Sequence, residues 1–238
     1  MRLDRTLVIS FSGIDGAGKS TQIQALGRYL DDRKLRFSIL TFWDDVVALS
    51  SLREHASITV FKGDPGVGSR DRPIVRRDKN VSSWYVVIFR LFLYLLDALQ
   101  LSVIAARRKY AGDDVMIFDR YIYDELANLP LERPGVRFYV RCILKLIPKP
   151  DIAFLIDADP YAACARKPEY PLVFVIRNRE AYLALAKFAG MKVLAPQSIE
   201  SASAAIERAV ESLCRERHEA VQLPTEYSRA ESTNRTAI

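Results

Sequence analysis

The chain has few cysteines, and they form no recognisable pattern. Cys142, Cys164 and Cys214 are the only three among 238 residues, and no CxxC pair or neighbouring histidine accompanies them. Their odd number and wide spacing argue against a disulfide framework and a zinc site. Residues 1–13 also lack the apolar core and small-residue cleavage site of a secretory signal. We therefore expect a cytoplasmic protein.

The sequence also lacks an uninterrupted apolar run long enough to cross a membrane. Its most apolar stretch, Trp84–Ala106, is broken by Arg90, Asp97 and Gln100. Arg90 and Asp97 are seven residues apart, which puts them on nearly the same helical face, with Tyr94 between them. We predict a buried helix with one polar stripe rather than a membrane span.

Neither sign of charge dominates the composition. Lys and Arg exceed Asp and Glu by 35 to 29, a net charge of +6. This excess fits a small anionic ligand as well as nucleic acid, so charge alone does not separate them. The densest basic segment, residues 70–79 within a loop-like stretch 62–80, either closes over an anionic ligand or is a solvated face.

Short apolar segments alternate with longer helical ones along the chain. This alternation predicts an α/β protein, with three α/β/α layers around a parallel sheet of about five strands. We expect one domain over residues 1–216 and a polar, flexible tail over 217–238. The expected strands are 7–12, 36–42, 114–119, 152–157 and 191–195, and the expected helices are 19–33, 84–109, 136–147, 160–166, 179–189 and 199–216, with a less certain helix over 46–57.

A glycine-rich turn follows the first strand directly. Residues 13–20, GIDGAGKS, match the phosphate-binding pattern GxxxxGK[ST], with the strand before it and the helix after it that this pattern requires. Backbone N–H groups of such a turn hold phosphates, the lysine reaches the β- and γ-oxygens, and the serine hydroxyl binds Mg²⁺. A glycine-rich turn without a ligand is the alternative. The expected ATP-binding residues are Gly13, Gly16, Ala17, Gly18, Lys19, Ser20 and Thr21.

A carboxylate and an arginine end the third predicted strand. Asp119 can bind Mg²⁺ or orient an attacking oxygen there, and Arg120 offers a planar fork to a phosphate. Because strands of a parallel sheet end at the same edge, Asp119 and residues 157–159 should meet the glycine-rich turn. The alternative is purely structural: Asp119 caps the next turn, and Arg120 pairs with a surface acid.

Four segments in order resemble the thymidylate kinase family, which has the P-loop NTPase fold. They are GIDGAGKSTQ at 13–22, DRY at 119–121, PDIAFLIDADPYAACAR at 150–166 and REAYLALA at 179–186. The likeness spans about residues 5–212. It implies transfer of the γ-phosphoryl group of MgATP to a nucleoside monophosphate, and a homodimer packed through long apolar helices.

The resemblance also implies roles for single residues. Asp15 and Arg120 match residues that approach the acceptor's sugar and phosphate, and Tyr94 matches the aromatic on which its base stacks, unless Tyr94 is ordinary core. Arg166 and Pro196 match residues beside the donor adenine. Residues 166–179 would form a lid whose arginines, Arg166, Arg177 and Arg179, neutralise the transition state.

Three departures from the family pattern fall on the acceptor side. Where the family carries an arginine after the second strand, this chain has Asp44, and Asp44 would repel a phosphate about 4 Å away by about 4 kcal/mol. Arg53 is a possible replacement. The family's base-reading arginine aligns with Ala98, and Asp97 beside it is an expected acceptor-binding residue. The run 122–128 lacks the expected small polar residues.

The sequence thus predicts a Mg-dependent thymidylate kinase-type enzyme, dTMP plus ATP to dTDP plus ADP. A divergent kinase for another small acceptor is the first alternative, with an acid after the second strand binding a hydroxyl or amine. A non-catalytic ATP sensor is the second. Neither a nucleic acid nor a membrane is an expected partner.

Overall fold

The computed structural model describes residues 6–42 and 84–222, with the backbone alone described for 84–90, 108–111 and 218–222. Five parallel strands lie in the order β2-β3-β1-β4-β5. They are β1 (Leu7–Ser12), β2 (Phe37–Thr41), β3 (Val115–Asp119), β4 (Ile152–Ile156) and β5 (Lys192–Leu194). The predicted parallel sheet of about five strands is confirmed.

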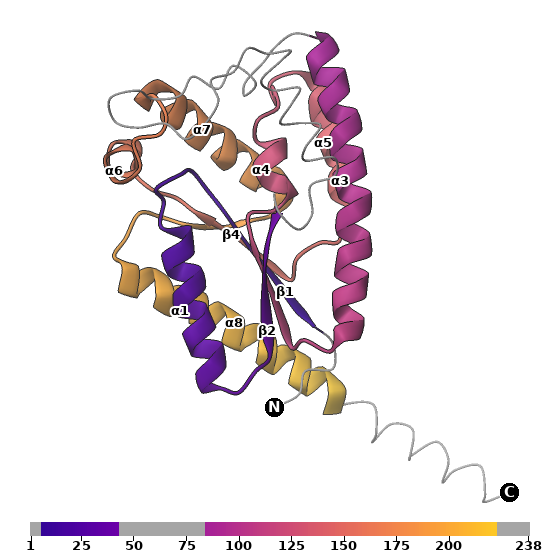
Figure 1. Ribbon diagram of the computed structural model, residues 1–238, viewed down its shortest axis with the longest axis vertical. Coiled ribbons are helices and arrows are strands. Elements are labelled where there is room, and N and C mark those ends of the chain that lie inside the picture. Colours follow the sequence, from indigo (N-terminus) through magenta and orange to yellow (C-terminus); the bar gives the residue numbers. More distant parts are fainter. Residues whose placement is uncertain (1–5, 43–83, 223–238) are drawn as a thin grey trace, which may run out of the picture.

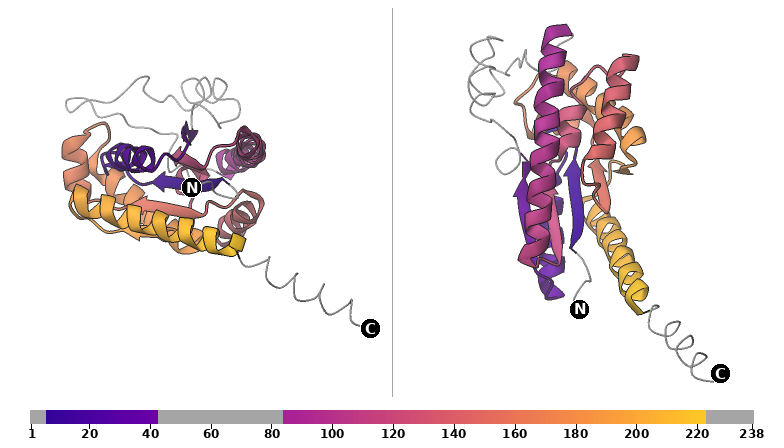
Figure 2. Two further views of the ribbon diagram at one scale, coloured as in Figure 1. Left: turned by 90° about the horizontal axis from the view of Figure 1, so that it is seen from below. Right: turned by 90° about the vertical axis from the view of Figure 1, so that its right-hand side faces the viewer.

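Helices cover both faces of this sheet (Figures 1 and 2). On one face α1 and α8 pack against each other, and on the other α3 contacts α5. The short α4 contacts α7 near the carboxyl ends of the strands. The helices are α1 (Lys19–Asp32), α3 (Trp84–Ala111), α4 (Ile122–Leu126), α5 (Pro134–Leu146), α6 (Pro160–Arg166), α7 (Leu172–Ala189) and α8 (Ile199–Gln222).

The central strand β1 is buried along its whole length. It pairs with β3 on one side, where Phe11 is opposite Asp119, and with β4 on the other, where Ser12 is opposite Leu155. A strand covered on both faces needs a continuous apolar run, which explains why β1 does not alternate. The residues that follow β1, β3 and β4 therefore meet at one edge.

Two expected boundaries are wrong. Helix α7 begins at Leu172 rather than Arg179, so only residues 167–171 of the expected lid 166–179 are non-helical. Helix α8 continues past Glu216 to Gln222 into the expected tail, and Arg217 within it pairs with Asp151. Arg53, Asp44, the 46–57 helix and the basic loop lie outside the described residues.

The long helix α3 is buried on one side only, rather than all round as expected, and the buried side carries Asp97 of the predicted polar stripe. Tyr94 is 3% exposed and Asp97 is fully buried, and Tyr139 of the adjacent α5 donates its hydroxyl to the Leu91 carbonyl. Burial, with a smaller contribution from Asp97, raises the pKa of Tyr139 to about 12. Among the described residues, none of the helices is both long and apolar enough to span a bilayer.

Candidate functional site

The glycine-rich loop, residues 13–20, is packed tightly against the end of β4 and against α6. Gly13 has a φ of 144°, and a Cβ there would lie 2.5 Å from the Ile156 carbonyl oxygen. Gly16 has a φ of 80°, and a Cβ there would overlap the Ala163 carbonyl oxygen. Both positions need glycine for backbone conformation and for space. These contacts fix the position of the loop relative to β4 and α6, directly before α1 begins at Lys19.

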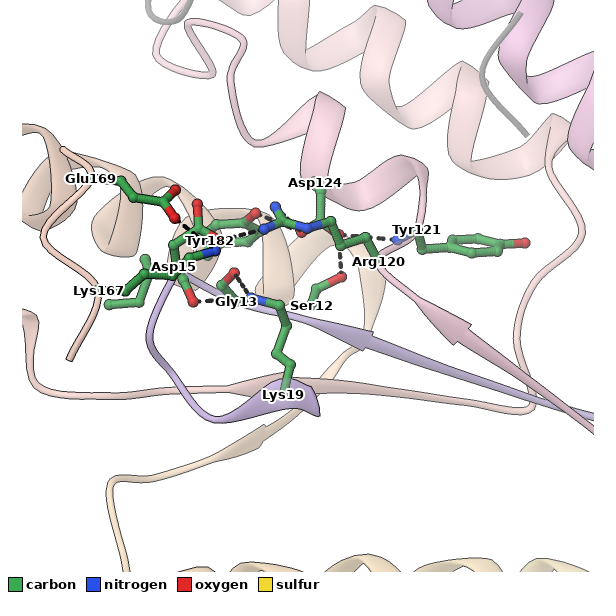
Figure 3. Close-up of polar contacts among 11 residues, drawn as sticks. Ser12, Gly13, Asp15, Lys19, Arg120, Tyr121, Asp124, Lys167, Glu169 and Tyr182 are labelled. Carbon is green, nitrogen blue, oxygen red and sulfur yellow. Dashed lines mark hydrogen bonds and ion pairs between the residues drawn. The ribbon is translucent and has the colours of Figure 1, made fainter. Parts of the chain in front are cut away.

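Lys19 is folded back inside this loop (Figure 3). Its Nζ donates to the carbonyl oxygens of Gly13, at 2.8 Å, and Ile14, at 3.0 Å. Burial, followed by the nearby Arg120, lowers the pKa of Lys19 to about 8, and the acids Asp15, Asp124 and Asp119 limit this shift. The side chain therefore remains mostly protonated at neutral pH, beside the backbone that would hold a phosphate.

Arg120 follows β3 and extends toward the loop. Its backbone is in the left-handed region, with a φ of 71°, and its N–H donates to the Phe11 carbonyl at 2.9 Å. Its guanidinium forms an ion pair with Asp15 of the loop, and its Nη1 lies 3.8 Å from Asp124 Oδ1. Burial opposes the charge, but Asp15 and then Asp124 outweigh it and raise the pKa of Arg120. This contact between Asp15 and Arg120 was not predicted from the sequence.

Asp124, which the sequence did not single out, lies at the centre of the polar contacts in Figure 3. It is 3% exposed and accepts hydrogen bonds from Ser12 Oγ at 2.7 Å, from the Tyr121 N–H at 3.1 Å and from the Tyr182 hydroxyl at 2.7 Å. Its only signal in the sequence is an acid within a run of apolar residues directly after DRY. These contacts join β1, α4 and α7.

The three arginines of the expected lid lie in different places. Arg179 binds Asp157 at the end of β4 through two hydrogen bonds of 2.6 and 2.7 Å, and this contact raises its pKa. Arg177 is exposed and lines a pocket of about 520 Å³ between α7 and the segment joining α4 to α5. Arg166 is exposed at the end of α6, where its Nε donates to the Ala162 carbonyl. Only Arg179 is fixed beside a strand end.

Oxygen donors suitable for magnesium flank the loop. Ser20 is exposed in the first turn of α1, and Asp119 is partly exposed at the end of β3, close enough to Lys19 to influence its pKa. In the described part of the chain, no group of three or more His, Cys, Asp or Glu residues could hold a metal ion. These two donors fit Mg²⁺, which is usually held by one or two protein oxygens together with phosphates and water.

The remaining predicted residues divide into exposed and buried ones. Thr21 and Pro196 are exposed, as a donor nucleotide would require, and Ala17 is buried in the loop. Tyr94 belongs to the hydrophobic core, which favours its structural alternative over stacking on a base. Asp97 is buried beside it.

No protein-family model matches the chain. The likeness to thymidylate kinases therefore rests on the four sequence segments alone. The site by itself can hold a polyphosphate through loop N–H groups and Lys19, and it places an ion-paired arginine next to that position.

If the glycine-rich loop binds ATP, its affinity for the nucleotide should depend on the protonation of Lys19. The phosphate attracts the ammonium form, and the free protein loses this proton as the pH rises through about 8. Binding above that pH must take up a proton, so we expect the affinity for MgATP to fall by up to about tenfold per pH unit. Isothermal titration calorimetry at a series of pH values measures the affinity. The Lys19→Met protein shows how much of the pH dependence comes from protonation of the nucleotide itself. A parallel pH dependence in both proteins would contradict the assignment.

Proposed function

We propose that the protein transfers the γ-phosphoryl group of ATP to a small acceptor, as a thymidylate kinase-type enzyme, with dTMP as the first acceptor to be tested. The observation that carries this proposal is the buried Lys19, held within a strand-loop-helix that matches GxxxxGK[ST]. Loop N–H groups and Lys19 would bind the β- and γ-phosphates, as in other proteins with this motif.

The chain's residues would act mainly by position and charge. An oxygen of the acceptor attacks the γ-phosphorus, the bond to the β-phosphate oxygen breaks, and ADP leaves. Lys19 would remain in contact with the phosphoryl group during its transfer. Among the three arginines of the expected lid, Arg179 is the best placed to bind this group, once its ion pair with Asp157 breaks. Mg²⁺, held by Ser20 and Asp119, would neutralise phosphate charge. Asp15 and Arg120 would orient the acceptor.

A different acceptor is the second candidate, favoured by one observation. Arg120 is already in contact with two carboxylates, Asp15 and Asp124, so its charge is largely neutralised before any acceptor arrives. Together with Asp44 in place of the family's arginine, this favours an acceptor with less negative charge than a nucleoside monophosphate. A hydroxyl or amine group would suit such a site.

ADP release separates these functions. The full chain with MgATP is tested against nucleoside monophosphates, nucleosides and small hydroxyl or amine compounds, with Lys19→Ala as the blank. Rapid turnover with dTMP alone supports the thymidylate kinase reaction. Turnover with an uncharged acceptor supports the second candidate. Tight ATP binding without acceptor-dependent ADP release would refute both and leave a nucleotide sensor.

We also propose a homodimer through α3, and a cytoplasmic location in keeping with the three free thiols. Four apolar side chains of α3 are exposed at helical spacing: Phe92, Leu95, Leu99 and Val103, between 36% and 58%. Such a stripe is typical of a helix that packs against a partner.

Leu99→Glu is expected to convert this dimer into monomers, because it places a charge at the centre of the apolar stripe. Light scattering after gel filtration should give twice the 27.0 kDa chain mass for the unmodified protein and one chain mass for the variant. The matched control is Leu146→Glu, since Leu146 on α5 is 62% exposed and outside the stripe. A monomeric unmodified protein, or loss of the dimer in the control, would count against α3 as the interface.

A further inference from the structure

The carboxylate of Asp124 holds groups from three separate parts of the chain. Oδ2 accepts from Ser12, the last residue of β1, and from the Tyr121 N–H. Oδ1 accepts from Tyr182 of α7 and lies 3.8 Å from Arg120 Nη1. Figure 3 shows these groups converging on one buried acid. Both oxygens of the carboxylate therefore accept hydrogen bonds, as a buried carboxylate requires.

Asp124 also fixes the backbone from which Arg120 projects. A φ of 71° is unfavourable for a residue with a Cβ, and needs support from its surroundings. The bond from the Tyr121 N–H to Asp124 closes the turn directly after Arg120 and starts α4. The same acid thus supports the strained turn and contacts the side chain that leaves it.

The guanidinium of Arg120 lies between two carboxylates. Asp15 comes from the glycine-rich loop and contacts Nη2, while Asp124 comes from α4 and lies nearest Nη1. Asp15 is hydrogen-bonded to Nη2, whereas Asp124 attracts Nη1 electrostatically at 3.8 Å, so the two acids together restrict the direction of the fork more than Asp15 does alone. With Asp15 as its single partner, the Arg120 guanidinium would move together with the glycine-rich loop.

Tyr182 extends this arrangement to α7. It is buried, and its hydroxyl bonds Asp124 at 2.7 Å. Arg179, almost one turn earlier on the same helix, is bound to Asp157 after β4. Helix α7, which follows the 167–171 segment, is therefore attached at two points close to the loop.

We propose that Asp124 is a positioning residue that fixes the Arg120 guanidinium beside the glycine-rich loop and links it, through Tyr182, to α7. The catalytic consequence rests on the proposed phosphoryl transfer: Arg120 would be held ready for the acceptor, and its placement would follow that of α7. The placement itself is a property of the protein without ligand.

The first test measures how firmly Arg120 is held. Phenylglyoxal modifies accessible guanidinium groups, and peptide mass spectrometry gives the rate at each arginine. Arg217 is the internal reference, because its side chain is 15% exposed against 22% for Arg120 and is likewise ion-paired with an acid, Asp151. General loosening of the fold accelerates both arginines, whereas loss of positioning accelerates Arg120 alone.

Two variants weaken the positioning of Arg120, one directly at Asp124 and one through Tyr182, and a third variant serves as a control. Asp124→Asn removes the charge with little change in size, and should raise the Arg120 to Arg217 rate ratio about tenfold. Tyr182→Phe removes one hydroxyl and should raise it about threefold. The matched control is Tyr139→Phe, which removes another tyrosine hydroxyl bond, a partly buried one between α5 and α3, and should leave the ratio unchanged.

The second test is kinetic, with dTMP or whichever acceptor supports turnover. We expect Tyr182→Phe, which leaves the charge of Asp124 in place, to raise the acceptor KM by about threefold and to leave the MgATP KM within about twofold. An unchanged rate ratio in both variants, or equal acceleration of both arginines, would overturn the positioning role. A rise in Asp124→Asn alone would refute the link to α7. If no acceptor supports turnover, the proposed function fails, and the rate ratio still decides whether Asp124 positions Arg120.

Discussion

Replacing Lys19 by alanine is expected to lower ATP-dependent phosphoryl transfer by about three orders of magnitude. The ammonium group is the one cation within the glycine-rich loop itself, and it lies beside the Gly13 and Ile14 carbonyls. Preorganised charges of this kind, which face the transferring group in a site with little water, each contribute on the order of 10²–10³ in rate or more. Steady-state ADP release with a saturating acceptor measures the loss.

The Lys19 result needs a control for folding, because the substitution also removes two hydrogen bonds from the loop. Lys19→Met keeps most of the side-chain volume, and its thermal unfolding should stay close to that of the unmodified protein. Lys187→Ala removes an exposed lysine from the last turn of α7 and should leave turnover unchanged. Activity within about twofold of normal in a folded Lys19→Ala protein would show that the loop does not bind the transferred phosphate.

The sequence predicted those parts of the site whose position depends on the hydrophobic pattern of neighbouring residues. The loop from Gly13 to Ser20 lies between a continuous apolar run and a helical repeat, so β1 and α1 have the expected positions. Asp119 was placed at the end of β3 because an apolar run stops there. In a parallel sheet these ends share an edge, which was enough to predict that Asp119 and residues 157–159 lie beside the glycine-rich turn.

The contacts of Asp124 could not be predicted in this way. Helix α4 is five residues long, too short for a periodic pattern, and the bonds of Asp124 to Ser12 and Tyr182 span 112 and 58 positions in the sequence. Such contacts depend on how α4 and α7 pack after the sheet has formed. The extension of α8 has a similar cause, since Arg217 is held by Asp151, 66 positions away.

Residue type alone could not predict which arginine of α7 lies near the glycine-rich loop. Arg177 and Arg179 differ by two positions, which is about 200° around a helix. Because α7 begins at Leu172, both belong to it, and they must face different sides. Arg179 consequently reaches Asp157, whereas Arg177 lines the pocket near Glu180. A lid without helix would have left either arginine able to reach the loop.

Gly16→Ala is expected to abolish measurable ATP binding, with an affinity loss of at least about 100-fold. The new Cβ would overlap the Ala163 carbonyl oxygen and lie 3.0 Å from the carbonyl carbon, and these are backbone atoms of α6 that cannot rotate away. The loop must therefore shift by a distance comparable to the overlap, which moves the N–H groups out of register with a bound phosphate. The positive φ of Gly16 adds a conformational cost of about 1–2 kcal/mol.

A second glycine separates these two causes. Gly190 ends α7 with a φ of 64°, and a Cβ at this position would have no heavy atom within 4 Å, so Gly190→Ala carries the conformational cost without the overlap. Chemical denaturation should give a loss of about 1 kcal/mol for Gly190→Ala with unchanged ATP affinity, and about 3 kcal/mol for Gly16→Ala. Equal losses in the two variants, with ATP binding retained in both, would mean that the contact between the loop and α6 does not shape the site. A larger loss of stability and of ATP affinity in Gly16→Ala alone would show that contact with the Ala163 carbonyl of α6 sets the conformation of the phosphate-binding turn.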